Sequence, residues 1–152
     1  MITLKQFQFV RTYTIRALNQ TKLDKWDFIP NGFSNSIRWN VGHIFITAEI
    51  LLNKAEQQYD IKNRKWVTFF APGTQPTDWT ETPPSTEELI EALKMQSRYI
   101  DTFFAGKINN KASESFIIAN HEMDTVDAFL QFVIFHEGLH AGIFKSIHNA
   151  LS

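Results

Sequence analysis

The sequence predicts an all-α fold, a four-helix bundle that forms a single domain over residues 1–152. Glycine and proline residues separate four stretches in which apolar residues recur at helical spacing. The chain is 43% hydrophobic and 14% aromatic, which is enough apolar material for the core of one domain of this length. No internal repeat points to another architecture.

The first two helices are predicted from their apolar stripes. The first begins at Thr3, where Gln6 completes a T-x-x-Q capping pattern, and it ends before IPNG at residues 29–32. The second begins within SNSIRWN at residues 34–40. The stripes consist of Phe7, Val10, Thr14 and Leu18 in the first helix, and of Trp39, His43, Ile46 and Ile50 in the second.

The third and fourth helices follow from their starts and stops. Ser85 and Glu88 form a capping-box pattern that opens the third helix, and Gly106 is a suitable stop for it. Carboxylates at residues 124–127 suit the N-terminus of the fourth helix, which runs to the end of the chain. The apolar stripe of this helix contains Phe129, Val133, His136, His140, Ile143 and Ile147.

Residues 57–84 separate the second and third helices and are far more numerous than a connection between neighbouring antiparallel helices needs. This segment is predicted to be a crossover or a lid. If the segment lies over the end of the bundle where a metal site is predicted below, its aromatic residues form walls of a pocket. The alternative is that these residues pin the segment to the bundle. These residues are Trp66, Phe69, Phe70 and Trp79.

The stretch HEGLH has the spacing of an H-E-x-x-H zinc site, in which two histidines one turn apart bind one ion. A metal would satisfy the polar atoms of His136 and His140 within an apolar stripe. A metalloprotease is not expected, because no strand pattern is evident and Ile143 and Ser146 replace the glycine and histidine of the longer motif. Glu137 is either a solvated side chain or a partner of a ligand.

A catalytic metal site needs a third protein ligand, and the chain has five histidines. His43 lies in an apolar stripe, where it is either a third ligand or a core histidine bonded to a backbone carbonyl. His148 lies two turns beyond His140 on the same helix, so it cannot reach the same metal. His121 precedes the fourth helix among polar residues and is interpreted as a solvated loop histidine.

SIRWNVGHI in the second helix and HEGLHAG near the C-terminus resemble the DinB-like, or DinB/YfiT-like, metalloenzymes. This resemblance implies up-down-down-up topology, with residues 57–84 as a long crossover between helices 2 and 3. It also implies metal ligation by His43, His136 and His140. Ala141 departs from the family, in which many members have histidine or arginine at this position.

Members of this family include thiol S-transferases that use bacillithiol or glutathione, and mycothiol-dependent isomerases. We therefore expect a divalent-metal-dependent transferase or hydrolase that acts on a small molecule, with zinc, nickel or manganese as the metal. A low-molecular-weight thiol such as bacillithiol is the expected nucleophile, because the chain has no cysteine. The alternative is a non-catalytic metal-binding or stress-induced interaction protein.

Composition restricts the partners. A formal net charge of −1 without a basic run argues against nucleic acid. The N-terminal twenty residues have no apolar segment typical of a signal peptide, and no stretch is long enough to span a membrane, so we expect a cytoplasmic protein without a membrane partner. Aromatic-rich bundles of this size commonly pair through an apolar helix face, which makes a homodimer a candidate assembly.

Overall fold

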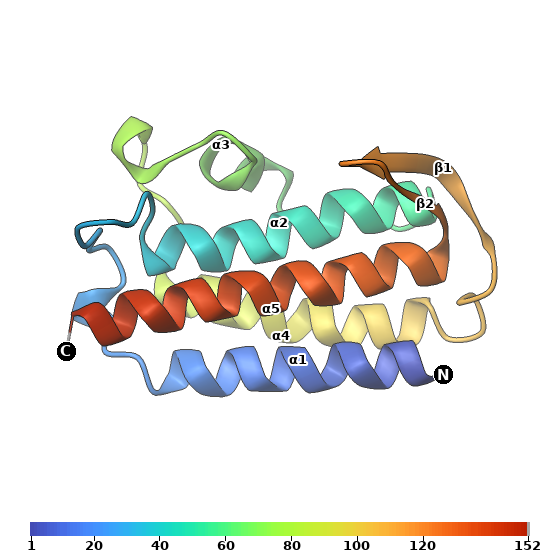
Figure 1. The fold of residues 1–152 in the computed structure, drawn as a ribbon, viewed down its shortest axis with the longest axis horizontal. Helices are drawn as coiled ribbons and strands as arrows, with labels where there is room; N and C mark the ends of the chain where they lie inside the picture. The colour runs from blue at the N-terminus through green and yellow to red at the C-terminus, as the bar shows by residue number, and fades with distance from the viewer. Residues whose placement is uncertain (152) are drawn as a thin grey trace.

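The protein is described here by a computed structural model, which covers residues 1–151. Four long helices lie side by side, and α1 and α5 run in the direction opposite to α2 and α4 (Figure 1). Their bounds are Ile2–Asn19 for α1, Ile37–Ala55 for α2, Thr86–Phe103 for α4 and Val126–Ala150 for α5. No helix within the described residues combines the length and the apolar character that crossing a membrane requires.

The first turns of the helices show which of the predicted capping patterns form. The capping box at Ser85 and Glu88 is confirmed, with hydrogen bonds in both directions. The capping pattern predicted at Thr3 is wrong, because α1 begins one residue earlier and the Thr3 hydroxyl instead donates to Asp127 on α5. Thr125 caps α5 by accepting a hydrogen bond from the backbone amide of Ala128.

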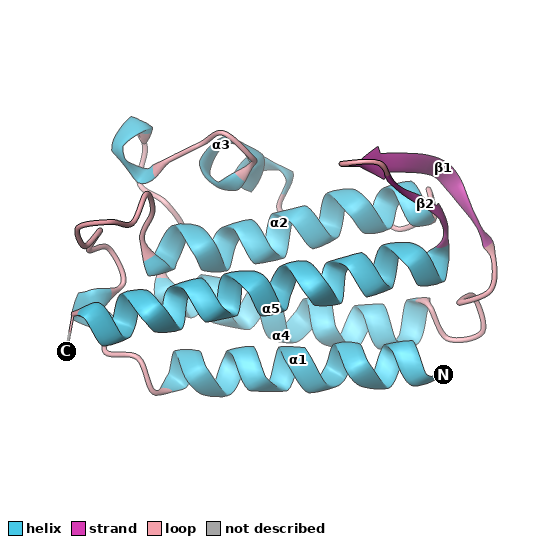
Figure 2. Cartoon of the chain, viewed as in Figure 1, coloured by secondary structure: helices cyan, strands magenta, loops and turns pink. Residues whose placement is uncertain are grey.

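The all-α prediction was wrong in one respect, because the chain also contains a two-stranded antiparallel sheet (Figure 2). Strands β1 (Lys111–Ile118) and β2 (His121–Thr125) form a hairpin between α4 and α5. Ala119 and Asn120 both have positive φ, as a two-residue type I′ turn requires. Alanine is unusual in such a turn, so the usual asparagine–glycine signal is missing from the sequence.

The segment between α2 and α4 contains α3 (Val67–Phe70) and the 3₁₀ turns Arg64–Trp66 and Pro76–Asp78; a third 3₁₀ turn, Leu23–Lys25, follows α1. In Figure 1 this crossover and the hairpin lie on the same side of the molecule, beside α2. The crossover packs closely against α2 at Gly42, where a Cβ atom would lie 2.4 Å from the Phe70 ring. Glycine at this position therefore allows the crossover to approach the helix.

Candidate metal centre

Three histidines meet at the contact between α2 and α5. His43 lies on α2, and His136 and His140 lie one turn apart on α5. The centroids of the three imidazole rings are 4.5, 4.6 and 4.8 Å apart. One ring nitrogen from each residue lies within 4.8 Å of the others. The structure thus brings the three predicted residues into one cluster that is compatible with a metal site.

Hydrogen bonds outside the cluster determine which nitrogen two of the rings can offer. The Nδ1 atom of His43 donates to the carbonyl oxygen of Phe70 over 2.7 Å. The Nδ1 atom of His140 donates to Oδ1 of Asn40 over 2.8 Å, and the Asn40 amide nitrogen donates to the Ser36 carbonyl. Because a neutral imidazole has a single N–H group, both rings keep a lone pair on Nε2.

The Nε2 atoms of His43 and His136 face each other at 3.1 Å. Two nitrogen ligands that each lie about 2.1 Å from a shared cation are separated by roughly 3.0 to 3.4 Å. The observed separation therefore fits joint coordination of one ion by these two residues.

Burial keeps the cluster neutral and ready to donate lone pairs. His43 is 6% exposed, and burial lowers its pKa despite the opposing effect of the hydrogen bond to Phe70. Burial, together with the neighbouring histidines, lowers the pKa of His136 to about 3; burial and the charge of His43 lower the pKa of His140 to about 4. Burial thus favours the neutral form of all three rings, in which one nitrogen of each can donate its lone pair to a metal.

Comparison with known proteins identifies the family. The model of the DinB superfamily matches residues 6–144, a range that contains all three histidines of the cluster. The chain belongs to the DinB superfamily. The comparison with curated proteins gave no match.

Two groups at this DinB superfamily site were missed by the sequence analysis. Asn40 accepts from His140, and the Phe70 carbonyl accepts from His43. Asn40 lies one turn before His43 on α2, so its spacing was a usable signal. The hydrogen bond to the Phe70 carbonyl could not be predicted from the sequence, because every residue has a backbone carbonyl.

Aromatic rings hold two of the histidines in place. Trp39 stacks on His43 with centroids 4.4 Å apart and an interplanar angle of 13°. The Trp39 Nε1 atom donates to the Thr74 hydroxyl in the crossover over 2.9 Å. On α5, Phe132 stacks on His136 with a centroid separation of 6.3 Å. The rotations of both imidazoles are therefore restricted by packing.

Glu137 does not lie where the glutamate of an H-E-x-x-H metalloprotease acts as a general base. Its side chain is 1% exposed and forms two hydrogen bonds with Arg11, both 2.9 Å long. The alternative of a solvated side chain was therefore wrong. The carboxylate is held by a guanidinium from α1 and is not hydrogen-bonded to any of the three histidines.

His121 and His148 are not members of the cluster. His121 lies exposed at the start of β2 and stacks on Phe132, with centroids 6.4 Å apart. The prediction that it lies in a loop was wrong, because it pairs with Ile118 in the hairpin. His148 lies in the last turn of α5.

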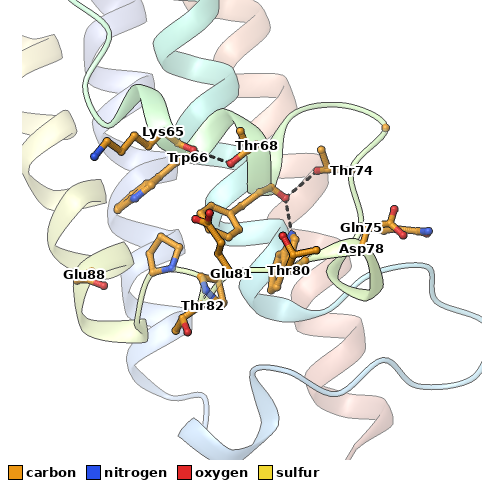
Figure 3. Close-up of a pocket in the computed structure, with 15 residues that line it drawn as sticks. Lys65, Trp66, Thr68, Thr74, Gln75, Asp78, Thr80, Glu81, Thr82 and Glu88 are labelled. Atoms are coloured by element: carbon orange, nitrogen blue, oxygen red, sulfur yellow. Dashed lines mark hydrogen bonds between the residues drawn. The ribbon is translucent and has the colours of Figure 1, made fainter.

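Residues of the crossover line an open pocket of about 860 Å³, and Trp66 is among them (Figure 3). Phe69 and Trp79 also line this pocket. None of the three clustered histidines lines this cavity. The fourth aromatic residue, Phe70, is fully buried and touches the cluster through its carbonyl oxygen. The crossover therefore contacts the histidine cluster through this carbonyl, and the three histidines do not line the aromatic pocket.

Proposed function

We propose that the protein is a divalent-metal-dependent enzyme acting on a small molecule, with His43, His136 and His140 as the metal ligands. The convergence of neutral histidines, two of which have their Nδ1 atoms engaged elsewhere, carries this proposal. Such outer hydrogen bonds orient metal-bound histidines and raise their basicity. The proposed metal is zinc, nickel or manganese, of which zinc and nickel suit imidazole nitrogens best. Three protein ligands leave one coordination position open for a substrate.

A cation bound there would supply Lewis-acid chemistry that makes a thiol or a water molecule more acidic. The chain itself supplies neither a thiol nor a carboxylate to this cluster, because it has no cysteine and Glu137 is bonded to Arg11. We therefore propose that the nucleophile comes from outside the chain. A low-molecular-weight thiol such as bacillithiol gives a thiol-dependent S-transferase, and water gives a hydrolase.

A non-catalytic metal-binding or stress-induced interaction protein is the second candidate. It is favoured by the composition of the cluster, which consists of histidines alone within the described residues. A general acid or base would have to be supplied by the substrate or by a bound thiol in the enzymatic alternative.

Residues 1–152 would form a single DinB-like domain with the up-down-down-up bundle topology, which the helix directions in Figure 1 support. We also propose that the protein is cytoplasmic. A homodimer is supported by exposed apolar side chains on α5, where Phe135 is 61% and Leu139 is 50% exposed.

Cobalt substitution separates the candidate functions. With Co²⁺ in the site, addition of millimolar bacillithiol should produce a sulfur-to-metal charge-transfer band that His136→Ala abolishes and His121→Ala preserves. Absence of the band together with hydrolysis of an ester or amide would replace the transferase with the hydrolase. Absence of both across a broad substrate panel would favour the non-catalytic protein.

A further inference from the structure

A second polar cluster lies between the four long helices and connects all of them. Arg11 of α1 binds Glu137 of α5 and also donates to Oε1 of Gln96 on α4 over 2.8 Å. The Gln96 amide nitrogen donates to Oε1 of Glu49 on α2 over 2.7 Å. Each of these four side chains is at most 4% exposed. The proposed metal chemistry uses none of them.

Glu49 is the end of this cluster, and its partners supply hydrogen bonds without positive charge. The Tyr59 hydroxyl donates to Oε1 and the Lys62 backbone amide donates to Oε2, both over 2.7 Å. Burial and the Glu49 charge raise the pKa of Tyr59, so its hydroxyl keeps the proton that it donates. Three donors and no acceptor surround the carboxyl group, which is the environment of a carboxylate.

The buried formal charges do not balance. Among residues 1–151, the buried lysine, arginine, aspartate and glutamate side chains are Arg11, Glu49 and Glu137. Arg11 contributes +1 and the two glutamates contribute −2, so their net charge is −1. Arg11 is already paired with Glu137 by two hydrogen bonds. Burial of the remaining charge is unfavourable unless a cation approaches it.

A cavity of about 260 Å³ lies between α2, α4 and the crossover, and the fully buried Glu49 is one of its lining residues. Glu49 and Gln96 line it together with apolar and aromatic side chains and with two polar residues of the crossover. Its other lining residues are Phe45, Lys62, Asn63, Ala92, Met95 and Tyr99. None of the three clustered histidines lines it, so it is distinct from the candidate metal centre.

We propose that this cavity binds a small organic cation, such as an alkylammonium ion, whose charge balances Glu49. The apolar walls suit an alkyl chain, and the Tyr99 ring can hold a cation by cation–π attraction. A divalent metal fits less well, because Glu49 is the one carboxylate in the lining and three hydrogen bonds already reach its oxygens.

Lys62 already shows where a positive charge is attracted. Its ammonium nitrogen lies 4.8 Å from the centroid of the Tyr99 ring, and both residues line the cavity. This ammonium should compete with a ligand cation for the same ring. Because Glu49 is contacted by the Lys62 backbone amide, Lys62→Ala removes the competing charge and preserves that hydrogen bond.

Calorimetric titration with n-butylammonium tests the proposal, with n-butanol as the uncharged probe of similar shape. The wild-type protein should bind the cation saturably and at least about tenfold more tightly than the alcohol. Glu49→Gln should weaken cation binding about tenfold, whereas Glu91→Gln on the exposed face of α4 should not change it. Absence of saturable binding to the wild type, or equal binding by Glu49→Gln, would overturn the proposal.

Two further variants keep the test informative if Glu49→Gln does not fold. Ala92→Leu fills the cavity without changing charge and should abolish binding. Lys62→Ala should tighten it several-fold, whereas Lys65→Ala, outside the lining of this cavity, should leave it unchanged. Binding that survives in Ala92→Leu, or that weakens in Lys62→Ala, would show that the cation binds elsewhere.

Discussion

The Nδ1 atom of His43 lies 2.7 Å from the carbonyl oxygen of Phe70, and this hydrogen bond joins α2 to the crossover at the candidate metal centre. The bond fixes the tautomer of the histidine and directs its Nε2 atom toward His136. The crossover therefore contributes to the orientation of His43, although none of its side chains belongs to the cluster.

Gly42→Ala should weaken metal binding by disturbing this contact. The new methyl group would lie 2.4 Å from the Phe70 ring, so the crossover must move and its carbonyl bond to His43 lengthens. We expect a loss of about tenfold in zinc affinity, measured by competition with a chromophoric chelator. Gly138→Ala on α5 is the matched control, because nothing lies within 4 Å of its added Cβ. Equal affinities in both variants would contradict the role of the crossover.

Asn40→Ala should reduce metal affinity because it removes the acceptor for Nδ1 of His140. Loss of such a partner commonly costs 10- to 100-fold, roughly, in metal affinity. Asn40→Asp keeps an acceptor oxygen at this position and should recover most of the affinity in the same competition assay. If Asn40→Asp binds zinc as weakly as Asn40→Ala, orientation of His140 by this hydrogen bond is not its function.

Glu137→Gln should reduce stability and leave the metal content of the folded protein unchanged. Removing one charge of a buried pair leaves Arg11 without its counterion, which costs about 3–5 kcal/mol. Chemical denaturation measures the loss, and metal analysis of the folded fraction measures occupancy. Unchanged stability with lost metal would instead place Glu137 at the metal centre.

Acid should destabilise the metal-free protein through the histidine cluster. On folding, the pKa falls from 6.5 to about 3 for His136 and from 6.5 to about 4 for His140. Between these folded values and 6.5, the unfolded state therefore binds more protons than the folded state. The contribution of these histidines to the free energy of unfolding is complete well above pH 6.5 and declines below it. At pH 5 the loss is about 1 kcal/mol per histidine after allowance for partial exposure. Thermal unfolding in EDTA should show this decline, and His136→Gln should diminish it. A pH-independent midpoint in the wild type would contradict it.

Much of the helical framework could be predicted, because helical periodicity and caps such as Ser85 act within one turn of the chain. The hairpin was missed because β1 is rich in polar residues and its turn uses Ala119 in place of glycine. The spacing of His136 and His140 on an apolar stripe indicated a metal-binding pair, and the resemblance to DinB-like proteins added His43. The burial of Glu137 was not predictable from local sequence, since its partner Arg11 lies 126 residues away.

The number of metal ions that the protein binds decides whether the three histidines form a metal centre. Protein purified without a nickel column and then equilibrated with zinc should contain about one tightly bound equivalent by elemental analysis. Alanine substitution of His43, His136 or His140 should remove that equivalent, whereas His121→Ala and His148→Ala should retain it. Failure of the wild type to hold zinc, or equal losses in all five variants, would contradict a metal centre built from these three histidines.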